Sequence, residues 1–268
     1  MLVQLKSNRP ILETIRAEFR LGKLSVSAEQ IDKWLVEGKL FLLLDGVNEI
    51  PSEELQHLAF EMVRGESEKP TEAWLTIPRS KAEGILEEWL AKRGVADAPT
   101  RAKEWLEDLL EHHLLQVAAD ARQIEFHHQL FQEYYAAEAL LARVENRHPD
   151  VMDDERLQHF YLNYLKWTEP VALMVALLED EAQVVRVVRL ALDVDLRLGA
   201  RLAGEVKEEF QWATVGMVGA LEIPEWFKVE LWGNTRSDAA IPRLLQSLEN
   251  EDSDVRRNGL SRTYGDKL

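Results

Sequence analysis

One run of residues, Lys39 to Pro51, constrains the fold of this chain more than any other, and it reads KLFLLLDGVNEIP. Five consecutive large apolar residues, Leu40 to Leu44, predict a strand that is buried on both faces. Such strands lie in parallel sheets covered by helices, and these sheets place functional groups at the carboxyl ends of their strands. Asp45 stands at that end, where a carboxylate can bind Mg²⁺. Glu49, four residues later, can orient an attacking water, so the run predicts half of a site that handles phosphates.

The loop that would hold the phosphates is missing, because none of the 268 residues fits the pattern G-x-x-x-x-G-K-[ST]. The two Gly-Lys pairs, Gly22-Lys23 and Gly38-Lys39, both lack the earlier glycine of this pattern. In phosphoryl-transfer enzymes of this type, the loop binds the β- and γ-phosphates and helps to hold the metal ion. We therefore expect no nucleotide cofactor and no ATP hydrolysis for this chain alone.

The composition limits the location and the partners of the chain. Its net charge of -16 excludes broad binding to nucleic acid or to an anionic membrane surface. The absence of cysteine excludes a disulfide framework and fits a cytoplasmic protein. Charge and proline interrupt the N-terminal residues too early for a signal peptide, and the longest apolar run, Val171 to Leu178, is too short to span a bilayer. We expect a soluble cytoplasmic protein.

Residues 1–95 predict a partial α/β layer. Short strands are expected at Leu2–Leu5, at the buried run and at Ala73–Ile77, where Pro78 ends the third. Helices are expected between them, and the one that follows Pro51 has an apolar face at helical spacing. That face is built from Leu55, Leu58, Ala59 and Met62. The order of elements indicates a partial parallel sheet of about three strands.

Residues 96–145 predict a small winged-helix-like unit. Apolar residues between Ala102 and Leu110 follow the spacing of an amphipathic helix. The segments Leu114–Val117 and Gln123–Phe126 predict a hairpin, and a helix from His127 to about Arg143 follows at once. Tyr134 and its aromatic neighbours on this helix are expected in the core.

The rest of the chain predicts helices only. Residues 146–229 form a helical region in which Thr168 is expected to cap a helix. Residues 230–268 contain a short helix at 239–248 and a second helix from Asp254, which together predict the start of an α-solenoid. Trp105, Trp167 and Trp212 lie on apolar helix faces and are expected in the core.

Three of these segments together resemble one family, the NACHT class of signalling NTPases in the STAND group of P-loop ATPases. The run KLFLLLDGVNEIP looks like the magnesium-binding strand of that family. Residues 126–137, FHHQLFQEYYAA, resemble its winged-helix signature F-x-H-x-x-F-Q-E-[FY]-[FY]-A-A. The tail IPRLLQSLENEDSDVRR is similar to HEAT-type repeats, which often follow bacterial NACHT domains. The resemblance covers residues 1–145 and 230–268.

The resemblance implies a role for four residues. Asp45 matches the acid associated with Mg²⁺, and Glu49 matches the acid that activates water. Arg79 matches the sensor arginine, and His128 matches the histidine that reaches the β-phosphate of bound ADP. From the residues alone, an alternative for Asp45 is that its carboxylate caps the following helix or turn. A metal site built from the histidine pairs of residues 112–113 and 127–128 is a further alternative.

The chain also departs from the family pattern. Asn48 stands where an acid is common, and Ile77-Pro78 replaces the hydroxyl-bearing residues that usually precede the sensor arginine. With the missing loop, these departures favour a degenerate, truncated NACHT-like regulatory protein that acts through protein–protein interaction. We expect protein partners along the C-terminal helical region, with self-association as one form.

Two alternative functions remain open. The first is an ATP/ADP-dependent switch whose P-loop comes from a separate or missing N-terminal segment, and that site would take Mg-ATP or Mg-ADP. The second is a HEAT-repeat scaffold for a light-harvesting partner.

Overall fold

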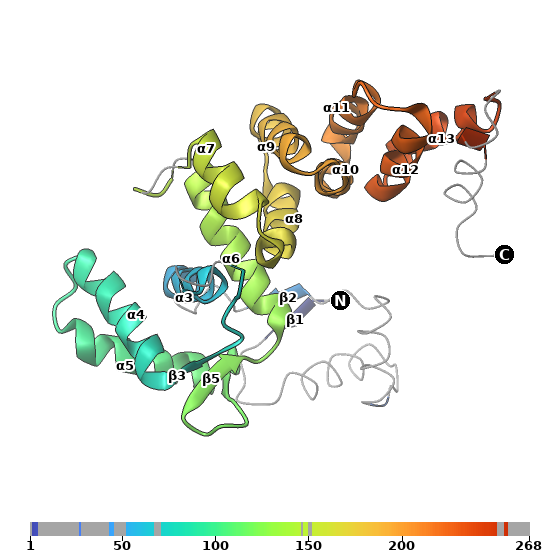
Figure 1. Cartoon of the computed structure of the whole chain (residues 1–268). Coiled ribbons are helices and arrows are strands. Elements are labelled where there is room, and N and C mark those ends of the chain that lie inside the picture. Colours follow the sequence, from blue (N-terminus) through green and yellow to red (C-terminus); the bar gives the residue numbers. More distant parts are fainter. Residues whose placement is uncertain are drawn as a thin grey trace.

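The computed structural model describes residues 2–4, 27, 43–45, 52–66, 71–145, 147–149, 152–250 and 255–256. Most of these residues are helical, and the described strands are short and form two small sheets. The chain is therefore a mixed α/β and helical protein, as its sequence predicts. Figure 1 shows the sheets and the first helices at one end of the molecule and an array of helices leading away from them.

Two strands from the predicted α/β layer pair in parallel. Strand β1 (Leu2–Gln4) lies beside β2 (Leu43–Asp45), so that Asp45 is opposite Gln4 at the carboxyl end of the pair. The predictions for the intervening helices and for Glu49 fall outside the described residues.

The second sheet has three antiparallel strands in the order β3-β5-β4. Strands β4 (Leu115–Val117) and β5 (Gln123–Phe126) form the predicted hairpin. The prediction that the segment at 73–77 joins the parallel layer is wrong, because β3 (Thr76–Pro78) pairs antiparallel with β5. Strand β3 is an edge strand, where the missing N–H of proline is tolerated. Ile77 of β3 and Ile124 of β5 are paired, and both are buried.

Four helices accompany the strands. They are α3 (Ser52–Arg64), α4 (Arg79–Lys92), α5 (Ala98–Glu111) and α6 (Gln129–Val144). All four residues of the predicted inner face of α3 are completely buried. Helix α3 packs on α6, and α4 packs on α5. The helix predicted after the hairpin is confirmed as α6, which begins two residues later than expected because His128 is its N-cap.

Helices also make up the described residues from Met152 onward, and short aspartate caps start several of them. Asp153, Asp180 and Asp195 each accept a hydrogen bond from the backbone N–H three residues later, which satisfies a donor at the helix start. The elements are α7 (Asp154–Leu157), the π-helix η2 (Gln158–Leu162), the 3-10 helix η3 (Leu165–Trp167), α8 (Thr168–Leu177), α9 (Glu181–Val194), α10 (Leu196–Glu205), α11 (Glu208–Gly219), α12 (Glu225–Thr235), η4 (Asp238–Ala240) and α13 (Ile241–Ser247).

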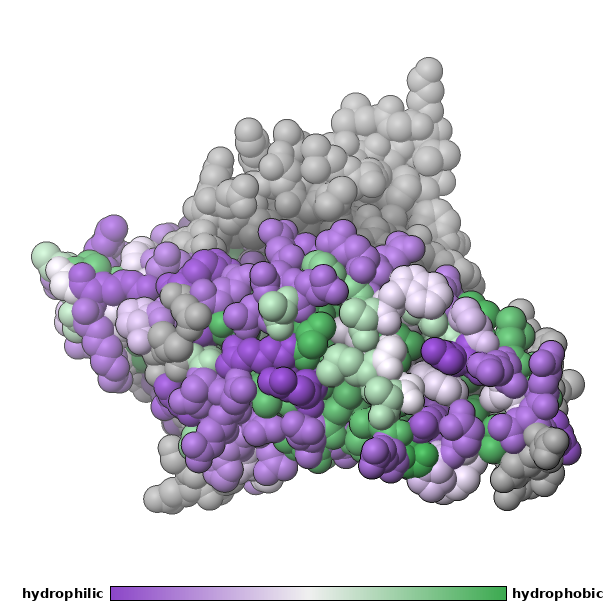
Figure 2. Space-filling view, turned by 90° about the horizontal axis from the view of Figure 1, so that it is seen from above, coloured by the Kyte–Doolittle hydropathy of each residue, from purple (hydrophilic) through white to green (hydrophobic). Residues whose placement is uncertain are grey.

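Helices α8 to α12 form an array in which each helix contacts its neighbours in sequence or the helix after next. Helix α8 packs on α10, α9 on α11 and α10 on α12. Seen from above, the face is hydrophilic at the end that holds α4 and α5, and hydrophobic residues gather around its middle and over the array (Figure 2). The prediction that Thr168 caps a helix is wrong, because η3 runs directly into α8 and Thr168 is already helical.

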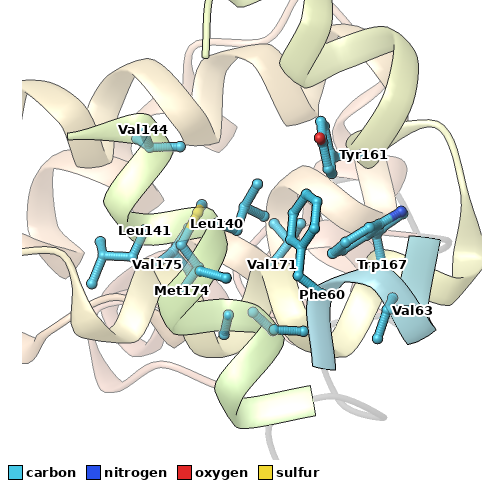
Figure 3. Close-up of a cluster of buried hydrophobic side chains, with 14 of the residues drawn as sticks. Phe60, Val63, Leu140, Leu141, Val144, Tyr161, Trp167, Val171, Met174 and Val175 are labelled. Carbon is cyan, nitrogen blue, oxygen red and sulfur yellow. The ribbon is translucent and has the colours of Figure 1, made fainter. Parts of the chain in front are cut away.

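A cluster of buried side chains joins the array to the first helices (Figure 3). Trp167 is 1% exposed, and its ring lies 5.2 Å from that of Phe60 on α3 and 4.8 Å from that of Tyr161. The core prediction is confirmed for Trp167, whereas Trp105 is only partly buried. It is wrong for Trp212, which is 68% exposed on α11.

Two glycines of the array provide a matched test of its packing. In α10, a Cβ on Gly204 would lie 1.7 Å from the carbonyl oxygen of Thr235, whereas a Cβ on Gly216 in α11 would meet nothing within 4 Å. We expect Gly204→Ala to lower the free energy of unfolding by about 1–3 kcal/mol through overpacking. Gly216→Ala should raise it by up to about 1 kcal/mol through helix propensity. Denaturant unfolding measures both, and equal effects would contradict the close contact between α10 and α12.

Candidate functional site

Arg79 is the first residue of α4 and follows β3 directly. Its guanidinium donates hydrogen bonds to carboxylates of Glu83, at 3.1 Å, and of Glu107 on α5. The bond to Glu107, followed by that to Glu83, raises the pKa of Arg79 above its ordinary value. The arginine thus forms one ion pair within α4, with Glu83, and one that links the start of α4 to α5, with Glu107.

His128 is the N-cap of α6. Its Nδ1 accepts a hydrogen bond of 3.1 Å from the backbone N–H of Leu130, and its side chain is exposed. Other residues of the FHHQLFQEYYAA segment also have structural contacts. The amide of Gln132, which is 3% exposed, donates to the carbonyl oxygen of Trp74 at 2.9 Å. Tyr134 is 36% exposed rather than buried as predicted, and its hydroxyl donates to Glu138.

The structure places Arg79 and His128 at opposite ends of β5. Pro78 is opposite Gln123 at the start of β5, whereas His128 follows the last residue of that strand. At about 3.3 Å per residue, the five residues from Gln123 to His128 span roughly 16 Å. The described backbone therefore does not bring the predicted sensor arginine and phosphate-binding histidine together.

The other two predicted site residues are described in part or not at all. Asp45 lies at the carboxyl end of β2, and only its backbone placement is described. Glu49 falls outside the described residues. In the part of the chain that the structure describes, no three His, Asp or Glu side chains gather as a metal site.

Comparisons of the chain with protein-family models, with curated proteins and with solved structures give no significant match. The resemblance to the NACHT class therefore rests on the sequence motifs alone. None of the helices in the described ranges is long and apolar enough to cross a membrane.

Sequence reasoning missed a cavity of about 880 Å³ that is lined by residues from α3, α4, α6 and the segment from Arg156 to Trp167. Many of its lining residues are basic, although the chain as a whole is acidic. The basic residues come from segments as far apart as Arg64 and Lys166, so no local pattern marks them as a group. Among the lining residues, only the adjacent pair Lys92-Arg93 could be noticed in the sequence. Adjacent basic residues of this kind are common on exposed helices.

The pKa of His57 on α3 reflects the positive charge around this cavity. The ring of His57 stacks on that of Trp89, with centroids 6.0 Å apart. Burial, followed by nearby positive charges, lowers the pKa of His57 to about 4. These charges belong to Arg143, Arg93, Lys92 and His148, which all line the cavity.

His57 should make the stability of the protein sensitive to mild acid. The unfolded chain takes up a proton near pH 6.5, whereas folded His57 resists it until about pH 4, so stability is lost as the pH falls between these values. Between pH 6.5 and 4.5, we expect the free energy of unfolding to fall by about 2–3 kcal/mol more in the parent chain than in His57→Phe. Urea unfolding across this range measures it, and parallel curves would refute it.

His128 should contribute to stability as a cap. Replacing it by alanine removes the acceptor for the N–H of Leu130 and should cost about 1 kcal/mol of unfolding free energy. His128→Asn should keep most of that stability, because asparagine is a good N-cap. Thermal unfolding of the two variants compares them directly. Equal losses in both would show that capping is not what His128 contributes.

Proposed function

We propose that this chain is a NACHT-like regulatory protein that acts through protein–protein interaction and does not hydrolyse nucleotides on its own. The order of its segments supports this proposal: a hydrophobic strand that ends in Asp45, a helix–hairpin–helix unit that carries FHHQLFQEYYAA, and a helical array. In this proposal, β1 and β2 belong to a P-loop-NTPase-like parallel sheet. The unit of α5, β4, β5 and α6 is winged-helix-like.

Two features argue against hydrolysis by this chain. It has no phosphate-binding loop in its sequence, and this loop carries much of the electrostatic stabilisation in phosphoryl transfer. Arg79, the predicted sensor, is already paired with Glu83 and Glu107. A guanidinium held by two carboxylates is poorly prepared to receive a phosphate.

The observation that carries the proposal is the surface of the array at α11 to α13, and we regard residues 230–268 as the start of a HEAT-like solenoid. A hollow of about 560 Å³ lies there and is lined by Trp212, Gly216, Trp232 and Arg243, among others. Trp212 is 68% exposed, although a large aromatic ring gains free energy when it is buried. Aromatic residues and arginine are enriched in protein interfaces.

Trp232 adds a polar feature to the same hollow. Its side chain is 6% exposed, and its indole N–H has no hydrogen-bond partner among the described residues. A buried donor without a partner is costly. The exposed ring of Trp212, with Arg243 in the lining of the same hollow, has the chemistry of a protein interface, and we propose a protein partner at this surface.

A photo-crosslinking residue at position 212 tests the proposed partner surface. In the cells that make the protein, we expect Trp212→benzoylphenylalanine to give a protein adduct of defined mass. The same replacement of Val117 is the control, because Val117 is 55% exposed on β4 and does not line the hollow. An adduct with a second copy of the chain would also support the proposal.

Equal crosslinking at both positions, or none at position 212, would refute a partner at this surface. The proposal also states that the chain does not hydrolyse nucleotides on its own. Magnesium-dependent ATP hydrolysis by the purified chain that is lost in Asp45→Ala would refute this statement.

A further inference from the structure

The cavity beside His57 has the size and the walls of a small-molecule site. Its volume of about 880 Å³ falls within the usual range of roughly 300–1,000 Å³ for ligand pockets. Helix α3 contributes Phe60 and Arg64, the end of α4 contributes Trp89, and α6 contributes Arg143. The segment after α7 closes the wall with Phe160 to Trp167. Neither Arg79 nor His128 lines it, so this site differs from the one that the family resemblance implies.

Positive charge dominates the lining. Within the described residues, two carboxylates line the cavity, Glu61 and Glu66. Six cationic side chains oppose them: Arg64, Lys92, Arg93, Arg143, Arg156 and Lys166. The chain carries a net charge of -16, so its average composition does not explain this excess of cations. Such a site attracts an anion.

Lys166 lies beside the end of α3. Its ammonium donates to the backbone carbonyl oxygens of Arg64 and Glu72, and no carboxylate pairs with it in the part of the chain that the structure describes. Burial, followed by the charge of Arg64, lowers the pKa of Lys166. Two positive groups thus lie at the same wall, where α3 ends.

The ion pairs of the neighbouring cations leave them available to a ligand. Arg64 pairs with Glu61 at 3.1 Å, and its side chain is 58% exposed. Lys92 and Arg93 pair with Glu88 and Glu53, which do not line the cavity, and these pairs are also exposed. Exposed ion pairs contribute little free energy, so an anion can compete for the cations.

Aromatic rings lie in the same cavity. The π-helix η2 carries Phe160, which is 53% exposed, and Tyr161. π-Helical turns are rare and are frequent at functional sites. At the end of α4, the guanidinium of Arg93 lies 3.6 Å from the centre of the Trp89 ring. An exposed ring such as Phe160 can stack on a planar group, and the cations of the same cavity can bind negative charge.

We propose that this cavity binds a nucleoside monophosphate, with its phosphate at Arg64 and Lys166 and its base against Phe160. Phosphate matches the cations, because guanidinium and ammonium groups form charge-assisted hydrogen bonds with its oxygens. A planar base matches the rings, and inorganic phosphate alone would leave most of the cavity empty. The ligand would contact both α3 and η2 and so connect the first helices with the segment that leads into the array.

Calorimetric titration of the full chain, without magnesium, tests the site. The probes are AMP, GMP, CMP and UMP, and each is compared with its nucleoside and with inorganic phosphate. We expect at least one monophosphate to bind with a dissociation constant below about 1 mM. It should bind about tenfold or more tighter than its nucleoside or inorganic phosphate, because the free energies of the phosphate and ring contacts add. If none of the four binds, or if the nucleoside or phosphate alone binds as tightly, the proposal is refuted.

Two arginines form a matched pair for locating the site. Arg64 lines the cavity and Arg101 on α5 does not, yet both are exposed and both pair with a glutamate three residues away. Arg64→Glu should weaken binding by about tenfold or more, as expected for a lost charge-assisted contact. Arg101→Glu should leave it within about twofold, as expected for a distant, screened charge.

Phe160→Ala and Lys92→Glu provide independent variants at exposed positions, and both should weaken binding by about threefold or more. Arg79→Ala should bind like the parent chain. Equal affinities of Arg64→Glu and Arg101→Glu in folded protein would overturn the assignment, as would a loss of binding in Arg79→Ala alone.

Discussion

The packing of Trp167 between Phe60 and Tyr161 is the contact on which the rest of the arrangement depends. A tryptophan of this kind buries about 150–250 Å² of surface, and here the side chain is 1% exposed. Because η3 runs directly into α8, fixing Trp167 against α3 also fixes where the array begins. The same packing forms one wall of the basic cavity, so its shape depends on this contact as well.

Local signals in the sequence predict the local elements well. The hairpin at 114–126, the inner face of α3 and the helix after His128 follow from spacing over fewer than twenty residues. The pairing of β3 with β5 does not follow from local spacing, because the two strands are far apart in the sequence. Thr76 and Gln123, whose side chains are joined by a hydrogen bond, are separated by 47 residues. Pro78 marks where the strand ends but not which edge it occupies. Trp212 shows a related difficulty, since helical spacing identifies a face of α11 without identifying what covers it.

The candidate sites show the same division between local pattern and distant pairing. A motif identifies His128 and Arg79 as residues of interest, yet their present contacts are a cap and a pair of carboxylates. The basic cavity has no motif at all. Arg64 and Lys166 are 102 residues apart, and the packing of Trp167 on Phe60 accompanies the contact of the Lys166 ammonium with the backbone of Arg64. A net charge of -16 conceals such a cluster, because a sum over the whole chain carries no information on position.

The π-helix at Gln158–Leu162 has a consequence for how such a cavity wall can arise. The backbone N–H of Asn163 bonds to the carbonyl of Gln158, five residues earlier, so this turn holds one residue more than an α-helical turn. Each residue of an α-helix turns the chain by about 100°. A single codon gained or lost here would therefore rotate Phe160 and Tyr161 relative to α7 while leaving both segments helical. An insertion or deletion of one residue can thus reshape this wall without a substitution of the side chains that form it.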